Sequence, residues 1–385
     1  MYLDHNEFSL LLELIEIMEE DLSEYSIGCL RSMGGYRGKH KAKKLSSHFK
    51  PRENYVMHGM MLKLCMELGL ELVKVTRGVK FRQDKFMKPF MDKCIEQRMK
   101  SFTKFEQMLW KILGNAVFGK TIENGDGRLD VRFIVDRALA VASQSNPRFR
   151  FFTPVSEEMT LHHLKPKMVD MRRPWPVGVS ILELSKYAMA KLYYYDLKPK
   201  LNCKVSILMS DTDSFFLAVL GKGRDEALKS IAHVMDFSNL DPSHELYDES
   251  RKRRPGYLKL EEARDIRSFV GLRSKTYSFL VKGEKRDEQS TRCKGVKSSV
   301  QKRIPYEAYV ACIESVCRLE ITQYNLQAKN HVNRLVRSDR VAFSSFDDKR
   351  YLLCPIHSCP RGSMVEILHK TTGRCWGCLQ EGGLF

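Results

Sequence analysis

Apolar side chains recur at helical spacing in several stretches of the chain. One face of an amphipathic N-terminal helix is marked by Phe8, Leu11, Leu12, Ile15 and Met18. Further helices are predicted within residues 54–120, with an extended interruption at 72–81, and then over 179–197 and 305–335. Helical segments are therefore expected along most of the chain, with other structure between them.

Strand patterns occupy the regions between these helices. Two apolar runs, 205–209 and 215–220, flank a short polar stretch and predict a β-hairpin. Other strands are expected at 128–135, around 257–260 and over 268–281, and the proline-rich residues 143–176 are expected to be loops.

The net charge of the chain indicates a class of binding partner. The 385 residues include 65 Lys and Arg against 47 Asp and Glu, a formal net charge of +18, which favours a polyanion such as nucleic acid. Residues 1–24 hold eight carboxylates and no Lys or Arg, whereas residues 31–52 hold eight basic residues and no acid. The basic stretch is interpreted either as a solvated loop or as an arm that contacts nucleic acid.

The distribution of apolar residues and cysteines argues against membrane-spanning and disulfide-rich secreted proteins. No stretch approaches 18 consecutive apolar residues, so no transmembrane helix is expected, and no secretory signal is visible. The eleven cysteines then favour reduced thiols or metal ligands over a disulfide framework, as in a reducing intracellular compartment.

The predicted hairpin carries the sharpest chemical feature, Ser210-Asp-Thr-Asp-Ser214. Its turn would expose Asp211 and Asp213 at one end of a sheet, where carboxylates can bind Mg²⁺ together with substrate phosphates. Turn chemistry alone also selects Asp and Ser. An Asp-x-Asp pair serves nucleotide-sugar glycosyltransferases as well, so the pair alone does not define the reaction.

The helix predicted over residues 102–120 carries a second candidate site. We expect its buried face to contain Phe105, Met108, Leu109, Ile112, Leu113 and Val117. A separate stripe is formed by Lys104, Gln107, Lys111, Asn115 and Phe118. Its ammonium, amide and aromatic ring suit a nucleotide triphosphate and base, although a solvated helix face would look the same.

Basic and aromatic residues alternate over residues 272–279. If this segment is one strand, Arg273, Lys275, Tyr277 and Phe279 share a face that could hold a nucleic-acid backbone. The alternative is an amphipathic strand with a basic solvent face.

Cysteines cluster in the last forty residues. Cys354 and Cys359 precede Cys375 and Cys378 by a loop, and two such pairs can bind zinc, with His357 as a substitute ligand. The alternative is a tail with incidental cysteines.

Taken in order, these segments resemble the protein-primed branch of the family B DNA polymerases. Lys111-Ile-Leu-Gly-Asn-Ala-Val-Phe-Gly-Lys120 resembles the fingers motif, the Asp211–Ser214 turn the palm motif, and Lys275–Tyr277 the Lys-x-Tyr motif. The segments Val177–Lys186 and Phe346–Tyr351 are similar to parts of transposon-type members. The resemblance spans about residues 54–353.

The resemblance implies an α+β right-hand polymerase core that adds deoxynucleotides to the primer of a primer-template DNA, with a terminal protein as a candidate primer. The implied regions are an acidic helix and basic arm (1–53), helical fingers (54–120), an antiparallel palm (121–282), a small helical thumb (283–345) and a Cys-rich tail (346–385). Nuclear or virion-associated residence is implied.

Site roles follow from the same resemblance. Asp213 and Asp211 would hold two Mg²⁺ ions. Nucleotide contacts are implied for Lys111, Arg98, Asn115, Phe118 and Gly119. DNA contacts are implied for Lys275, Tyr277, Arg273 and Lys120.

The sequence also departs from the family pattern. Met209 replaces the usual Tyr before the palm motif, and Ala116 and Phe118 replace Ser and Tyr in the fingers. The upstream palm aspartate and the exonuclease domain are not found, and Asp4 lies in only a faint echo of that motif. We therefore expect the C-terminal part of a polymerase or, alternatively, a catalytically dead remnant that binds nucleic acid.

Overall fold

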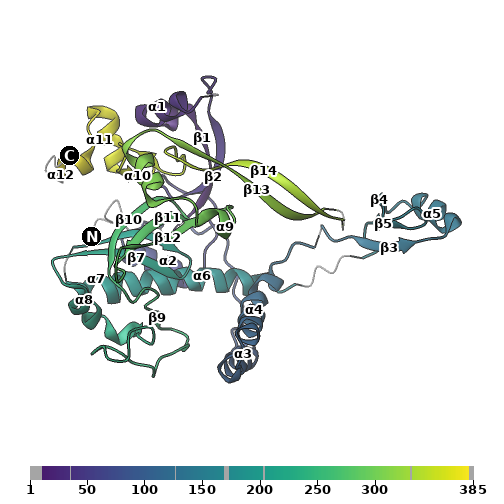
Figure 1. Cartoon of the computed structure of the whole chain (residues 1–385), viewed down its shortest axis with the longest axis horizontal. Helices are drawn as coiled ribbons and strands as arrows, with labels where there is room; N and C mark the ends of the chain where they lie inside the picture. The colour runs from purple at the N-terminus through teal and green to yellow at the C-terminus, as the bar shows by residue number, and fades with distance from the viewer. Residues whose placement is uncertain are drawn as a thin grey trace. The chain divides into compact units, whose positions relative to one another are not determined.

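The fold is described from a computed structural model that covers residues 11–34, 36–125, 127–168, 173–202, 204–329 and 332–380 (Figure 1). Helices are mixed with several small, mostly antiparallel sheets, so the predicted α+β class is confirmed. The chain divides into two compact units. The first comprises residues 1–80, 184–325 and 336–385, and the second comprises 81–183 and 326–335.

The first unit begins with a two-stranded sheet rather than the expected N-terminal helix. Strand β1 (Glu13–Met18) pairs antiparallel with β2 (Lys41–Ser46), and Glu16 lies opposite Lys43. Within β1, alternate β-branched residues favour a strand, and the acidic strand is matched by a basic partner. The prediction of one helix over 1–24 is therefore wrong for residues 13–18, and part of the basic stretch is a strand.

Two helices follow in the first unit. Helix α1 (Glu24–Ser32) starts at Ser23, whose Oγ accepts a hydrogen bond from the Ser26 amide at 3.1 Å. Helix α2 (Gly59–Glu67) confirms part of the helical pattern predicted after residue 54. No strand forms at 72–81, so that expectation is wrong.

The helix predicted over 179–197 is present and longer. It runs as α6 (Trp175–Lys191), continues as a π-helical segment (Leu192–Leu197) and ends in α7 (Lys198–Leu201). Tyr193 and Leu197 belong to a core that also contains side chains of α8 (Arg224–Ser230) and the segment after it. The same core includes Phe215 and Leu217 from the second strand of the predicted hairpin, so the helix and the hairpin share one core.

That hairpin is as predicted: β6 (Lys204–Asp211) pairs with β7 (Ser214–Leu220). A three-stranded antiparallel sheet follows, formed by β10 (Ile266–Arg273), β11 (Thr276–Val281) and β12 (Glu288–Cys293). A short parallel pair joins β8 (Met235–Asp236) to β9 (Leu258–Lys259).

Residues 272–279 do not form one strand. The chain turns at Ser274 and Lys275, because Lys275 adopts a left-handed φ of 60° and Arg273 pairs with Thr276 across the turn. The expected common face of Arg273, Lys275 and Tyr277 is therefore wrong.

The segment expected to be a helical thumb is only partly helical. It contains α9 (Ser298–Gln301) and α10 (Tyr306–Glu314), followed by the hairpin strands β13 (Arg318–Lys329) and β14 (Val332–Ser344). Alternation in β13, with Leu319 and Ile321 on its less exposed side, suits a strand. The helix predicted to residue 335 is therefore wrong beyond Glu314.

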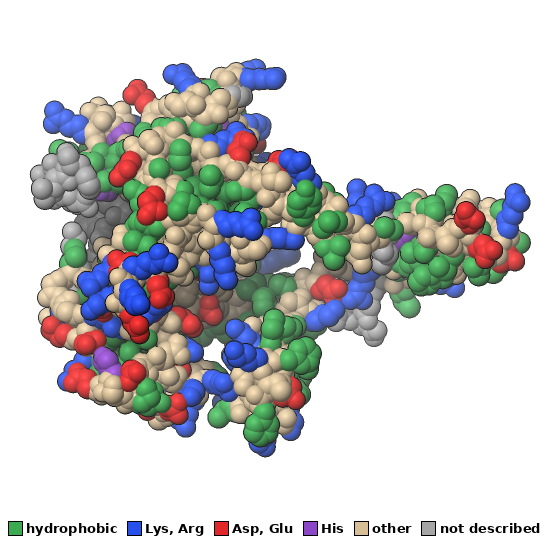
Figure 2. Space-filling view, in the orientation of Figure 1, with side chains coloured by type: hydrophobic (Ala, Val, Ile, Leu, Met, Phe, Trp, Pro, Cys, Tyr) green, Lys and Arg blue, Asp and Glu red, His purple; other side chains and the backbone are tan. Residues whose placement is uncertain are grey.

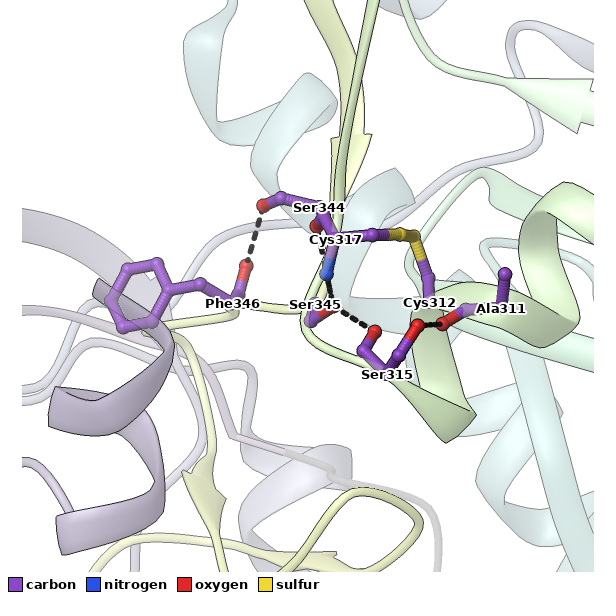
Figure 3. The surroundings of a disulfide bond; sticks show 7 residues. All are labelled: Ala311, Cys312, Ser315, Cys317, Ser344, Ser345 and Phe346. Carbon is purple, nitrogen blue, oxygen red and sulfur yellow. Dashed lines mark hydrogen bonds between the residues drawn. A yellow bond between two sulfur atoms is a disulfide. The ribbon is translucent and has the colours of Figure 1, made fainter. Parts of the chain in front are cut away.

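A disulfide joins Cys312 at the end of α10 to Cys317 just before β13 (Figure 3). Beside it, the Ser345 hydroxyl accepts a hydrogen bond from the Cys317 amide at 2.9 Å. The other eight described cysteines do not form disulfides. The expectation of reduced thiols or metal ligands therefore misses this one pair.

The tail forms a small module in the first unit. Strands β15 (Tyr351–Leu352) and β16 (Ser358–Cys359) make a short hairpin, followed by α11 (Met364–Thr372) and α12 (Trp376–Gln380).

The second unit contains a pair of packed helices, a small sheet with a helix of its own, and the start of α6. Helices α3 (Lys88–Lys100) and α4 (Lys104–Thr121) pack together where Gly114 faces Met91 and Cys94. The sheet has the order β3-β5-β4, and its elements are β3 (Asp130–Ile134), α5 (Arg137–Gln144), β4 (Phe149–Pro154) and β5 (Thr160–Leu164). The strand predicted near 128–135 is confirmed, whereas the expected loop at 143–176 contains two strands.

The small sheet should lose stability in mild acid. His162 in β5 is fully buried between Phe149 and Phe152, and burial lowers its pKa below the ordinary 6.5. Because the unfolded chain then takes up a proton more readily, stability is highest above pH 6.5 and falls as the pH drops toward the folded-state pKa. Hydrogen exchange of residues 130–164, corrected for intrinsic pH dependence, measures this loss.

The His162→Phe variant should flatten that pH profile, because it keeps an aromatic ring but removes the titrating group. His233→Phe is the matched control, since His233 is exposed and lies 3.3 Å from Asp196. Equal acid sensitivity in wild type and His162→Phe would show that His162 is not the cause.

Candidate functional site

The two aspartates of the Asp-x-Asp pair lie at the turn of the β6–β7 hairpin. Asp211 ends β6 and is partly buried, whereas Asp213 lies in the turn and is exposed. Thr212 between them has a left-handed φ of 57°, and the Asp213 amide donates to the Asp211 carbonyl at 2.6 Å. The Ser214 hydroxyl donates to the same carbonyl at 3.2 Å. The turn is thus held by its own hydrogen bonds and presents two carboxylates at one end of the hairpin.

Lys275 reaches this turn from the β10–β11 turn. Its Nζ lies 3.1 Å from Asp211 Oδ1, although the two residues are far apart in sequence. Both side chains are partly exposed, with 53% of the lysine and 32% of the aspartate accessible. The ion pair itself therefore contributes little to stability. It matters as a placement, because it brings a cation next to the paired carboxylates.

Tyr277 supports this placement through aromatic packing. Phe216 of β7 packs against Tyr277 of β11 with ring centroids 5.2 Å apart, and also against Phe269 and Phe279. Burial raises the pKa of Tyr277, and the nearby Asp211 charge raises it further while Arg292 lowers it. The phenol therefore keeps its proton at neutral pH. The aromatic cluster joins the Asp-x-Asp hairpin to the sheet that carries Lys275.

Arg273 contacts a different part of the first unit from Lys275. Its Nη2 donates to the Ala342 carbonyl of β14 at 2.9 Å. The guanidinium thus connects β10 to the β13–β14 hairpin instead of sharing a face with Lys275.

The predicted nucleotide-binding residues lie in the second unit. Lys111 and Asn115 are exposed on α4, and Phe118 and Gly119 are half-buried on the same helix. Arg98 is half-buried on α3. The stripe predicted on α4 is therefore present as a helix face, in a different unit from Asp211 and Asp213.

Lys120 lies in the last turn of this helix, in a cluster of charges. Its Nζ lies 3.0 Å from Glu123, and Arg128 lies 2.9 Å from the same carboxylate. Lys120 and Arg128 lower the pKa of Glu123 to about 2.

The expected apolar face of α4 is mostly exposed, as Figure 2 shows for hydrophobic side chains on α3 and α4. Phe105 is 76% accessible and Met108 is 61% accessible. The half-buried positions of α4 instead include Trp110, Gly114 and Val117. The small Gly114 lets the neighbouring helix approach, so this face packs. The prediction of a buried Phe105–Leu113 face is wrong, and only Val117 of that set is half-buried.

Four side chains of the tail converge on one point: Cys354, His357, Cys375 and Cys378. Cys354 Sγ lies 3.6 Å from Cys375 Sγ and 3.8 Å from Cys378 Sγ. His357 Nδ1 lies 3.2 Å from Cys354 Sγ and 3.4 Å from Cys378 Sγ. A zinc ion with bonds of about 2.3 Å to sulfur would separate tetrahedral sulfur ligands by roughly 3.8 Å. The cluster therefore has the size of a tetrahedral metal site.

The backbone around the cluster favours this arrangement. The His357 amide donates to Cys354 Sγ at 3.3 Å, and the Leu353 amide donates to the His357 carbonyl at 2.9 Å. A side chain at Gly377 would overlap the His357 ring, so glycine permits the close approach of α12. These contacts place all four ligand atoms within 4.8 Å of one another.

Cys359 is not a member of the cluster. It is buried in β16, opposite Tyr351, within the small core of the tail. His357 takes the position expected for Cys359, and the Cys354-x-x-His357 spacing equals that of Cys375 and Cys378. That matching spacing is the signal that could have placed His357 first.

In the described part of the chain, the tail cluster is the only group of three or more His, Cys, Asp or Glu ligands found close together. The Asp211–Asp213 pair thus has no third such ligand among the described residues. Asp4, the faint N-terminal candidate, lies outside them.

No helix in the described residues is long and apolar enough to cross a membrane. Comparison with protein-family models, curated proteins and solved structures found no match.

Proposed function

We propose that the chain takes part in template-directed DNA synthesis, adding deoxynucleotides to a primer 3′-hydroxyl. The observation that carries the proposal is the 3.1 Å approach of Lys275 to Asp211. These residues come from two separate segments that resemble polymerase motifs. One segment would hold Mg²⁺ at the reacting end of the primer and the other would clamp that end, so the proposal needs them to lie close together. The aromatic packing of Phe216 on Tyr277 supports the same arrangement.

In this proposal, the primer 3′-oxygen attacks the α-phosphorus of a deoxynucleotide, forming one P–O bond while the bond to pyrophosphate breaks. The hydroxyl proton is lost to solvent. Asp211 and Asp213 would hold Mg²⁺, which neutralises charge on the phosphates when bound. Lys275 would contact a primer phosphate next to the 3′ end, and Tyr277 would pack beside it.

A second candidate function is nucleic-acid binding without catalysis. It is favoured by the absence of a third carboxylate near Asp211 and Asp213 within the described residues. The chain, with its net charge of +18, would then bind DNA with an affinity that falls steeply with salt. Adding Mg²⁺ and nucleotides would not extend the primer.

Lys275 provides the test of the proposed function. Extension of a labelled primer-template by the purified chain should require Mg²⁺ and nucleotides, and Lys275→Ala should slow it roughly tenfold, because one charge-assisted contact is lost. Lys275→Arg should retain most activity because it keeps the positive charge.

Lys282→Ala is the matched control. Lys275 comes directly before strand β11, and Lys282 is an exposed lysine directly after it. Binding should weaken more for primed duplex than for single strands only in Lys275→Ala. Equal loss on both DNAs, without extension by any variant, would favour the binding-only function.

We also propose that the tail cluster binds one zinc ion through Cys354, His357, Cys375 and Cys378. Three thiolates and one imidazole in tetrahedral arrangement are a ligand set typical of structural zinc. Metal analysis by mass spectrometry should find close to one zinc per chain, and Cys375→Ser should lose it.

A further inference from the structure

The tail module is too small to be stable through its own core. Its buried apolar cluster consists of Tyr351, Leu353, Cys359 and Val365, with Cys375 packed against them. Modules of fewer than about 40 residues usually need a disulfide, a metal or a partner surface. The module offers two such supports: a four-ligand cluster that would hold a metal, and a contact with the N-terminal segment that contains the strand pair β1–β2.

Arg361 forms the centre of the contact with the N-terminal segment. Its side chain is only 1% accessible, and its guanidinium donates to the carbonyls of Asp21 and Asp348, the latter at 3.0 Å. The Phe49 amide donates to the Arg361 carbonyl at 2.8 Å. Both the side chain and the backbone of Arg361 therefore bind the segment that contains β1 and β2.

Charged and polar groups extend this contact along β2. Asp348 lies 3.2 Å from Lys44 Nζ and 3.5 Å from His40 Nε2. The Ser46 hydroxyl donates to the Lys349 carbonyl. Basic residues of the N-terminal segment are thus bound by the start of the tail, where Asp348 is itself mostly buried.

The metal ligands enclose Arg361 in the sequence. Cys354 and His357 come before it in the β15–β16 turn, and Cys375 and Cys378 come after it, beyond α11. An ion bound to all four would therefore close the loop that carries Arg361. Without that cross-link, the loop would be ordered by the four-residue core and by individual hydrogen bonds such as those from Arg350 to Ser358, and ordering a loop costs conformational entropy.

We propose that zinc binding in the tail controls the docking of the N-terminal strand pair β1–β2, with Arg361 as the connecting residue. This inference rests on the proposed zinc site. The ion acts as a structural lock: it orders the loop, the loop buries Arg361, and Arg361 fixes the segment from Asp21 to Phe49. Loss of the ion releases the strand pair β1–β2, while the β6–β7 hairpin stays folded on its own core.

Hydrogen exchange on the full-length chain, with zinc content measured in parallel, tests the proposal. Removing zinc with a chelator should speed exchange in residues 41–50 at least about tenfold and leave 205–211 unchanged. Adding zinc back should restore protection. Cys375→Ser should behave as the chelated protein and ignore added zinc, whereas Cys94→Ser, a buried cysteine of α3, should behave as wild type.

Arg361→Gln separates the lock from the metal site. It should keep one zinc per chain and still lose protection in residues 41–50. If Arg361→Gln and chelated wild type both keep full protection, the lock is wrong even if zinc binds. If the wild-type chain takes up no zinc, the zinc site itself is wrong, and the lock with it.

Discussion

The Asp213→Asn variant should lose at least about 100-fold in the rate of primer extension while it still binds primer-template DNA. Asp213 is the exposed carboxylate of the β6–β7 turn, so the amide keeps the shape and hydrogen bonding of the turn. It removes the negative charge that would hold a divalent cation against the phosphates. Single-turnover extension at saturating DNA measures the loss, and fluorescence anisotropy of labelled DNA measures binding.

Asp287→Asn is the matched control, because Asp287 is an exposed aspartate in the loop between β11 and β12. It makes the same change of charge and should leave the rate unchanged. Equal rates for wild type and Asp213→Asn would remove Asp213 from the reaction. A wild-type chain that binds DNA but never extends the primer would favour the binding-only function.

The sequence predicts this site only up to the hairpin. Two apolar runs around a short polar turn specify β6 and β7 locally, so the position of Asp211 and Asp213 follows from the pattern. The approach of Lys275 does not follow, because it depends on packing between Phe216 and Tyr277 across two sheets. The turn at Lys275 also cannot be predicted from the sequence, since a lysine in a left-handed conformation leaves the alternation of basic and aromatic residues unchanged.

Helical spacing of apolar residues predicts secondary structure less well where contacts with another segment decide between helix and strand, or decide which helix face is buried. Residues 13–18 fit a helix as well as a strand by their apolar positions, and pairing with the basic residues 41–46 selects the strand. On α4 the apolar stripe suggests one packed face, but the small Gly114 brings a different face onto α3. Both errors come from tertiary contacts that a local pattern does not contain.

The sequence predicts only part of the tail cluster, because local structure selects one of its ligands. Spacing identifies Cys375 and Cys378 as a pair, and it permits either Cys359 or His357 beside Cys354. The short β15–β16 hairpin decides, because Cys359 lies within a strand and points into the tail core. Local turn geometry thus selects the ligand where spacing leaves two choices.

The Phe343→Ala variant should destabilise the core around α10 by about 3–5 kcal/mol. Phe343 of β14 is fully buried, and its ring lies 4.4 Å from that of Tyr309, which is also fully buried. Truncation removes apolar burial and leaves a cavity beside Tyr309, in a core that also includes Val270 and Cys293. Hydrogen exchange of residues 306–314 should show protection reduced by a factor of about 100 or more.

Phe102→Ala controls for the loss of an aromatic side chain, because Phe102 is 99% accessible. It should change stability by less than about 0.5 kcal/mol. Phe343→Leu should fall between the two, since leucine fills part of the space and keeps the site apolar. If Phe343→Ala leaves exchange in residues 306–314 unchanged, β14 does not support α10, and the two rings do not pack in solution as described.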